Sequence, residues 1–142
     1  MKSPLRYPGS KVAFSPCFFK MTQKNHKPSE IIVEPFAGSA AISLYALGNN
    51  ICEHIILIER DPLIYCFWKS VFDYTEHLVQ EINRVDITLE TWLSLNELRL
   101  LDKPDGKAIV DLGFAGLFFN RTNFSGIIGS TPIGGWNKIQ II

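Results

Sequence analysis

The sequence predicts an α/β domain built on a parallel β-sheet, and two stretches carry this prediction. The first is 31–42, where an apolar, β-branched segment reaches an acid, turns at a proline and a glycine, and continues as small residues at helical spacing. The second is the strand-like run 55–58, which ends directly before Glu59. Two apolar strands separated by a helical segment are typical of a βαβ unit, whose strands lie parallel.

Length and composition indicate one domain or a piece of one. The chain has 142 residues, of which 46% are hydrophobic, enough for a single core. Its 14 basic and 14 acidic residues cancel, which excludes a global electrostatic attraction to nucleic acid. A local basic patch remains before Glu30, and its plain alternative is a solvated basic tail; it comprises Lys2, Arg6, Lys11, Lys20, Lys24 and Lys27.

The cysteines and the apolar segments limit the environment of the protein. Cys17, Cys52 and Cys66 are odd in number and lack C-x-x-C spacing, so we expect reduced, mostly buried thiols and no metal site. No apolar window reaches the roughly 18 residues that span a bilayer, and Met1-Lys2 leads into no signal-type segment. These features predict a cytoplasmic protein without a membrane partner.

The first half of the chain divides at its turn-forming residues. Pro8 and Gly9 indicate a compact loop over 5–11, and a short helix is expected over 14–21. The polar segment 23–29 predicts a surface loop before the first strand. After the turn, good helix formers predict a helix over 40–47 that stops at Gly48.

The second half of the chain is predicted to form a series of helices. Pro62 suits a first helical position and is followed by apolar residues at helical spacing through Phe72. Thr75 is expected to cap a helix over 76–85, with Leu78, Val79 and Ile82 directed inward. Further helices are predicted over 89–101, with Trp92 in the core, and over 109–119.

Two acids mark a candidate ligand site at the ends of the predicted strands. Ligands of open parallel sheets bind beyond the carboxyl ends of the strands, where glycine lets the backbone come close. Glu34 and Glu59 end the two strands 25 positions apart, and a carboxylate there can accept both hydrogen bonds of a ribose diol. An ordinary βαβ core with two acids at strand ends is the alternative interpretation.

The phosphate motifs that accompany most nucleotide sites are absent from the sequence. The turn lacks the spaced glycines of G-x-G-x-x-G, and the chain has no G-K-[ST]. A ribose-binding acid without a pyrophosphate cradle suits an adenosine ligand that carries no phosphate. S-adenosylmethionine is the common ligand of this kind.

Three separated blocks resemble the DNA adenine-N6 methyltransferases of the Dam type. The stretch 5–11, an aromatic followed by Pro-Gly-Ser-Lys, resembles the family's opening cofactor motif. The stretch 33–39 resembles its first Rossmann turn, and 118–126 resembles the Asn-Arg…Phe-Asn-Gly segment that leads toward target recognition. The three occur in the family's order, which implies a Rossmann-like, S-adenosylmethionine-dependent methyltransferase fold that is incomplete at its C-terminus.

The resemblance assigns roles to individual residues. Lys11 would supply a cation for the methionine carboxylate of the cofactor, and Glu59 would bind its ribose hydroxyls. Asp61 would flank the adenine or, equally, cap the next helix. Arg121 would contact a DNA phosphate or, as the alternative, satisfy loop carbonyls after its helix. The complete implied cofactor set is Tyr7, Lys11, Glu34, Pro35, Phe36, Ala37, Gly38, Ser39, Glu59 and Asp61.

The sequence also departs from the family pattern. Ser10 replaces a glycine, Ser125 stands where asparagine is common, and Glu59 replaces a more usual aspartate. The family's catalytic Asp-Pro-Pro-Tyr element is missing, because the chain contains no Pro-Pro pair. We therefore expect no catalytic residue here and no activity of the chain alone.

The expected organisation follows from these assignments. Residues 1–119 would form the cofactor-binding half, and 120–142 would begin the segment leading to target recognition. The expected partners are double-stranded DNA, through the complete enzyme, and a complementary C-terminal polypeptide that carries the catalytic motif. Two alternatives stay open: a non-catalytic module that binds DNA or protein and has a vestigial cofactor site, and methylation of RNA or a small molecule.

Overall fold

The computed structural model describes residues 1–22, 30–100 and 106–135, which form two compact units, Met1–Glu59 and Arg60–Ile142. We call these the N-terminal unit and the C-terminal unit. The surface loop predicted over 23–29 lies outside the described residues, as do Lys24 and Lys27 of the basic patch. Among the helices of the described ranges, none is long and apolar enough to cross a membrane.

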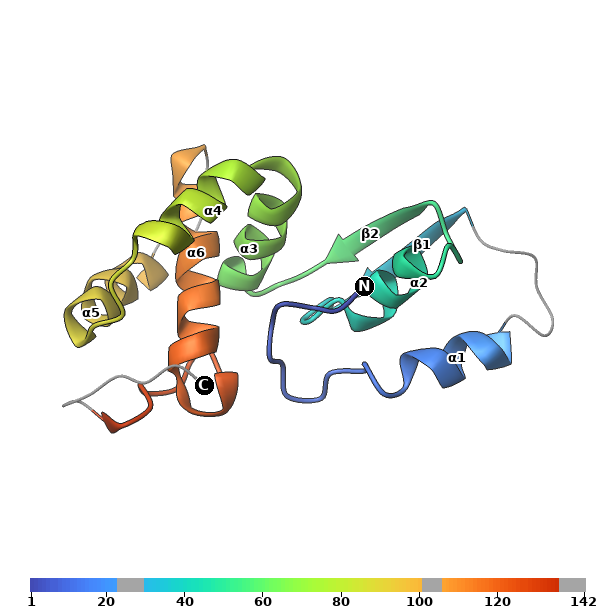
Figure 1. The fold of residues 1–142 in the computed structure, drawn as a ribbon, viewed down its shortest axis with the longest axis horizontal. Coiled ribbons are helices and arrows are strands. Elements are labelled where there is room, and N and C mark those ends of the chain that lie inside the picture. Colours follow the sequence, from blue (N-terminus) through green and yellow to red (C-terminus); the bar gives the residue numbers. More distant parts are fainter. Residues whose placement is uncertain (23–29, 101–105, 136–142) are drawn as a thin grey trace. The chain divides into compact units, whose positions relative to one another are not determined.

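The N-terminal unit contains the predicted βαβ arrangement (Figure 1). Strands β1 (Ile31–Pro35) and β2 (His54–Ile58) pair in parallel, in a register that runs from Ile31 opposite His54 to Pro35 opposite Ile58. Helix α2 (Ala41–Gly48) connects them, and α1 (Ser15–Thr22) precedes them. The parallel pair with its connecting helix fits the predicted α/β class.

A small apolar core joins these elements. Phe19 of α1, Ala46 of α2 and Cys52 are buried together. The Phe19 ring stacks on Tyr45 with centroids 5.8 Å apart, which holds α1 against α2. Partly buried apolar side chains from both helices and both strands surround this core: Phe18, Ile32, Ile42, Tyr45, Leu47, Ile51 and Ile55.

The C-terminal unit is helical. Its elements are α3 (Pro62–Asp73), α4 (Thr75–Arg84), α5 (Leu89–Glu97), the 3₁₀ helix η1 (Leu98–Leu100), α6 (Lys107–Thr122) and the 3₁₀ helix η2 (Phe124–Gly126) (Figure 1). The predicted helix over 89–101 is thus α5 continued by η1, with residue 101 outside the described residues. Helix α6 is longer than the predicted 109–119 and runs across the functional boundary expected at 119/120.

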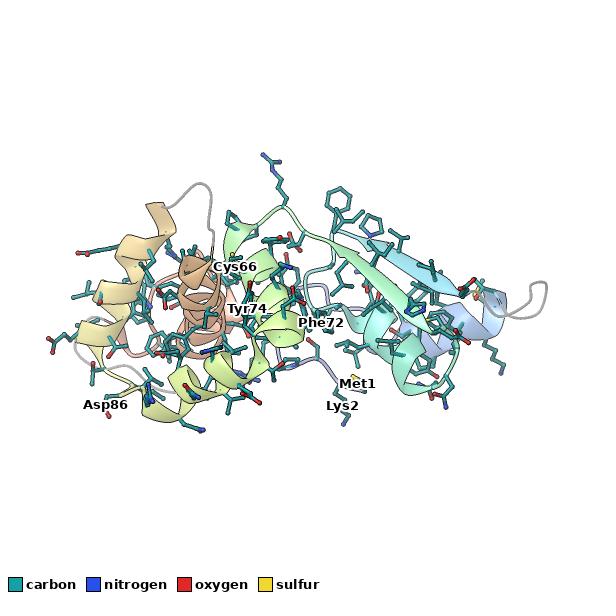
Figure 2. The ribbon with its side chains drawn as sticks, turned by 90° about the horizontal axis from the view of Figure 1, so that it is seen from above. Met1, Lys2, Cys66, Phe72, Tyr74 and Asp86 are labelled. Carbon is teal, nitrogen blue, oxygen red and sulfur yellow. The ribbon has the colours of Figure 1, made fainter. Side chains whose placement is uncertain are left out.

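Close contact between α3 and α6 depends on glycine. A Cβ on Gly113 would lie 2.6 Å from the Cys66 carbonyl oxygen, and one on Gly116 would lie 2.7 Å from that of Leu63. The Ser70 hydroxyl donates to the carbonyl of Ile109 at 3.2 Å, which adds a polar contact to the same interface. Cys66 is fully buried on α3 (Figure 2).

The expectations for Thr75 and for two of the inward-directed residues of α4 were wrong. Thr75 does not cap α4: it is the first residue of that helix, and its hydroxyl donates to the Val71 carbonyl of α3 at 2.6 Å. Leu78 is buried, but Val79 and Ile82 are 46% and 39% exposed, because this helix contacts its neighbours along a narrow stripe. The cysteines are mostly buried, as expected: Cys52 and Cys66 are buried and Cys17 is exposed.

Candidate functional site

The turn between β1 and α2 holds its backbone in an unusual conformation. Phe36, Gly38 and Ala40 all have left-handed φ angles, of 57°, 47° and 49°. Such a conformation costs a residue with a Cβ about 1–2 kcal/mol, so surrounding contacts must stabilise it. One such contact is the hydrogen bond from the Ala37 N–H to the carbonyl of Ile58, at 3.0 Å. The turn is therefore fixed to the carboxyl end of β2.

Glu34 at the end of β1 stabilises the start of α2. Its Oε2 accepts a hydrogen bond of 2.9 Å from the N–H of Ser43, the third residue of the helix. Ala40 at the cap position provides no side-chain hydrogen bond. A carboxylate at a helix N-terminus satisfies a free N–H group and interacts favourably with the helix dipole.

Glu59 lies beside the same turn. Its Oε2 accepts a hydrogen bond of 2.8 Å from the N–H of Gly38, across 21 positions of sequence. Both strand-end acids that the sequence singled out thus hold backbone N–H groups of the turn or of the helix that follows. The parallel pairing of β1 and β2 brings the carboxyl ends of the two strands, and so both acids, to the same edge of the sheet. Their expected role in ligand binding stays a prediction.

The opening loop over 5–11 folds onto the turn. A Cβ on Gly38 would lie 2.8 Å from the Tyr7 ring, so the ring occupies the space that the missing side chain leaves. The hydroxyls of Ser10 and Ser39 share a hydrogen bond of 2.9 Å. The Lys11 ammonium is exposed and donates to the carbonyl of Gly9 at 2.6 Å. Two motifs separated by about 30 positions are therefore in direct contact.

A pocket of about 500 Å³ lies between the opening loop and the turn. This volume is within the range usual for small-molecule sites. Eight of the ten predicted cofactor residues line it: Tyr7, Lys11, Glu34, Pro35, Phe36, Ala37, Gly38 and Ser39. Glu59 is not part of the lining but is bonded to Gly38, which is.

Sequence reasoning missed part of the lining. Phe18 of α1, Ile32 of β1 and Ile42 of α2 contribute apolar side chains to the pocket. Their apolar spacing indicated core positions, and nothing in the sequence says which end of the core opens to solvent. Ser10 was noted only as a departure from the family pattern, although its hydroxyl joins the loop to the turn.

Asp61 caps a helix in the C-terminal unit. Its Oδ1 accepts hydrogen bonds from the N–H groups of Leu63, at 2.9 Å, and Ile64, at 3.3 Å, and Pro62 follows it at the first helical position. This is one of the two roles that the sequence left open for Asp61. A role beside the cofactor stays a prediction.

The Asn-Arg-Thr-Asn segment forms the end of α6 and supports the loop after it. Asn120 and Asn123 are fully buried. The Asn120 amide donates to the carbonyl of Gly126 at 2.8 Å, and the Asn123 oxygen accepts from the Trp92 indole at 2.7 Å. The Asn123 amide also donates to the carbonyls of Ile128 and Ser130. These asparagines therefore hold the loop in place, and Trp92 is a core residue as predicted.

Arg121 differs from its neighbours because it is partly exposed. It lies in the last turn of α6, where a cation interacts favourably with the helix dipole. The structure places it on the surface side of a segment whose asparagines face the core. Within the described residues, no group of three or more histidine, cysteine or acidic side chains is arranged to hold a metal ion.

A parallel βαβ unit whose strand-end acids surround a glycine turn defines an α/β protein with a ligand pocket at the end of its strands. A comparison with models of protein families then identifies the family of the chain. The model of the D12 class N6 adenine-specific DNA methyltransferases matches residues 7–140. The chain therefore belongs to this family. Searches of characterised proteins and of solved structures gave no match.

Proposed function

We propose that the chain is the S-adenosylmethionine-binding part of a site-specific DNA adenine-N6 methyltransferase with a Rossmann-like fold. Membership of the D12 family supports the reaction and the DNA substrate. The observation that carries the cofactor assignment is the pocket in the N-terminal unit, where the opening loop meets the glycine turn between two strand-end acids.

The residues around this pocket fit the chemical groups of S-adenosylmethionine. The exposed Lys11 ammonium is a cation for the methionine carboxylate. The Glu59 carboxylate, fixed by Gly38, is an acceptor for the ribose hydroxyls, since an ionised carboxylate has about four acceptor sites. The apolar side chains of Phe18, Ile32 and Ile42 bury the uncharged parts of the ligand. The bound cofactor supplies an activated methyl group.

The chain is proposed to be inactive alone. The exocyclic amine of adenine is a poor nucleophile, because its lone pair is delocalised into the ring, so an enzyme must accept its hydrogens as charge develops. The family does this with Asp-Pro-Pro-Tyr, and these 142 residues contain no Pro-Pro pair. A complementary polypeptide with that motif would supply the missing groups.

Arg121 is proposed to contact a DNA phosphate. Its partly exposed position at the end of α6, next to the asparagine that holds the following loop, supports this role, since phosphate contacts position a protein on the duplex. Arg121→Gln should then weaken binding of the complete enzyme to all DNA sequences alike and should lower the salt dependence of that binding by about one ion. A loss confined to the target sequence would contradict a phosphate contact.

Calorimetric titration of the chain with S-adenosylmethionine tests the cofactor assignment. We expect saturable binding that Glu59→Gln weakens by about 10- to 100-fold, the range for a hydrogen bond to a charged group. The glutamine oxygen can still accept from Gly38, so the turn is retained. The matched control is Glu53→Gln, which removes the same charge from an exposed position just before β2.

Two outcomes would overturn this proposal. If Glu59→Gln bound as tightly as the unchanged protein, the ribose assignment would be wrong. If the chain retained DNA but had no affinity for S-adenosylmethionine, it would be a non-catalytic DNA-binding module with a vestigial pocket.

A further inference from the structure

The opening loop over 5–11 is fixed at both of its ends. Leu5 at its start is buried, with 5% of its surface exposed. The carbonyl of Lys11 at its end accepts hydrogen bonds from the N–H and from the hydroxyl of Ser15, both at 2.8 Å, and Ser15 is fully buried. Buried contacts of this kind open rarely, so any movement of the loop falls on the residues between its ends.

The middle of this loop is an exposed tip, which consists of Pro8, Gly9 and Ser10. The Ser10 N–H donates to the Tyr7 carbonyl at 2.9 Å, which closes a turn. The hydroxyl of Ser10 shares a hydrogen bond of 2.9 Å with that of Ser39, across 29 positions of sequence. Ser39 is buried in the glycine turn, at 4% exposure, so this contact ties the exposed tip to a fixed part of the unit.

The tip also determines where the Lys11 ammonium lies. Its Nζ donates to the carbonyl of Gly9 at 2.6 Å, and a Cβ on Gly9 would lie 3.8 Å from the same atom. Because Ser10 directly follows Gly9, a contact that fixes Ser10 also restrains the carbonyl that holds the ammonium. The position of this cation therefore depends on the Ser10–Ser39 contact.

The side chain at position 10 makes this contact possible. The Dam-type pattern has a glycine there, and a glycine has no hydroxyl to offer. The backbone of Ser10 has no left-handed φ, so its conformation does not require glycine. The serine thus adds to the loop a bond that the more usual residue cannot supply.

We propose that Ser10 and Ser39 are positioning residues, which hold the tip against the glycine turn and so place the Lys11 ammonium for a carboxylate. This inference rests on the proposed function, in which Lys11 is the cation for the methionine carboxylate of S-adenosylmethionine. An ammonium has three donors, so it can bind that carboxylate while it keeps the Gly9 carbonyl. A tip that is fixed beforehand loses less conformational entropy when the ligand binds. The contact therefore favours ligands that carry an amino-acid end.

Calorimetric titration of the full chain with two ligands tests this role. S-adenosylmethionine carries the carboxylate, and 5′-methylthioadenosine has the same adenosine and sulfur without the amino-acid end. We expect Ser39→Ala to weaken the binding of S-adenosylmethionine by about fivefold, the usual net effect of one hydrogen bond. The loss for 5′-methylthioadenosine should be smaller, below about twofold. A merely structural defect would weaken both ligands alike.

Further variants show whether the two hydroxyls act through one contact. If they do, Ser10→Ala/Ser39→Ala binds S-adenosylmethionine no more weakly than either single variant. Ser10→Thr keeps a hydroxyl at an exposed position and should retain the affinity that Ser10→Ala loses. Thr22→Val is the matched control, because it removes a hydroxyl that donates to a carbonyl of its own helix and lies outside the pocket lining.

Amide exchange of the ligand-free chain, followed by NMR, tests the contact without any cofactor. We expect the Ser10 N–H to exchange about fivefold faster in Ser39→Ala, which leaves the sequence of the loop unchanged. Unchanged exchange, equal losses for the two ligands, or additive losses in the double variant would overturn the proposal.

The two measurements separate this inference from the proposed function. Binding of S-adenosylmethionine that neither Ser10→Ala nor Ser39→Ala weakens would overturn the positioning role and leave the cofactor assignment intact. Faster exchange in Ser39→Ala, in a chain that binds neither ligand, would contradict the cofactor assignment and support the Ser10–Ser39 contact.

Discussion

Ser125 has a backbone conformation that its side chain does not favour. Its φ and ψ angles are 55° and 16°, in the left-handed region, and its side chain is exposed. Asparagine adopts this region more readily than serine does, because its short amide bonds to the local backbone. This explains why the position suits the asparagine that is common there in the Dam-type pattern. Ser10, the other serine departure, has no left-handed φ and needs no glycine.

Ser125→Asn should therefore stabilise the protein. We expect the free energy of unfolding to rise by about 0.5–1 kcal/mol, a part of the left-handed penalty. Urea unfolding followed by the fluorescence of Trp92, which is bonded to this segment through Asn123, measures the change. Ser130→Asn, at a position without a left-handed φ, is the control and should have little effect. Equal stabilisation by both variants would contradict the backbone explanation.

Gly38 is required for two separate reasons, its φ of 47° and the Tyr7 ring beside it. Gly38→Ala should cost about 1–2 kcal/mol through the backbone alone and should also displace the ring. We expect faster amide exchange in α2 and weaker S-adenosylmethionine binding.

A double-mutant cycle separates the two costs at Gly38. Tyr7→Ala removes the ring, so the double variant Tyr7→Ala/Gly38→Ala should lose less protection from exchange than the sum of the single variants. Strictly additive losses would show that the ring and the glycine act independently.

At the scale of elements, α3 and α6 approach each other so closely that Gly113 has no room for a side chain. Gly113→Ala would place a methyl group 2.6 Å from the Cys66 carbonyl, and the helices must separate to accept it. We expect a loss of about 1–3 kcal/mol, the usual cost of overpacking, measured by urea unfolding of the C-terminal unit.

Gly129→Ala provides the matched comparison for Gly113→Ala. It makes the same chemical change where a Cβ meets nothing within 4 Å, and its stability should be nearly unchanged. If the two variants were equally stable, the close helix contact would not be a determinant of the fold.

At the scale of the whole molecule, the three cysteines should differ in reactivity. Burial, assisted by the Asp61 charge, raises the pKa of the Cys66 thiol to about 11, and burial also raises the pKa of Cys52. A raised pKa keeps the thiol protonated and unreactive below that pH, since the thiolate is the nucleophile. A thiol reagent at pH 8 should therefore modify Cys17 first, and all three only after unfolding. Rapid reaction of Cys66 in the folded protein would contradict its burial.

Much of the architecture was predictable because local signals agree with one another. Apolar runs predicted both strands, and Pro62 predicted the start of α3. Gly48 predicted the end of α2, and it is the last residue of that helix. The prediction failed at Thr75, where two helices follow each other so closely that the hydroxyl bonds back to the preceding helix. It also failed at Val79 and Ile82, because helical spacing identifies an apolar face but not how much of it is covered.

The sequence by itself determined the family, the order of the N-terminal elements and the position of two acids at strand ends, because these depend on residue type and spacing along the chain. Tertiary structure alone decided that Tyr7 fills the space above Gly38 and that Asn120 and Asn123 face inward. It also decided that Arg99 Nη2 is buried without a hydrogen-bond partner among the described residues. The physical reason is that hydrogen bonding and close packing depend on distances between residues far apart in the chain, and local sequence patterns carry no information about those distances.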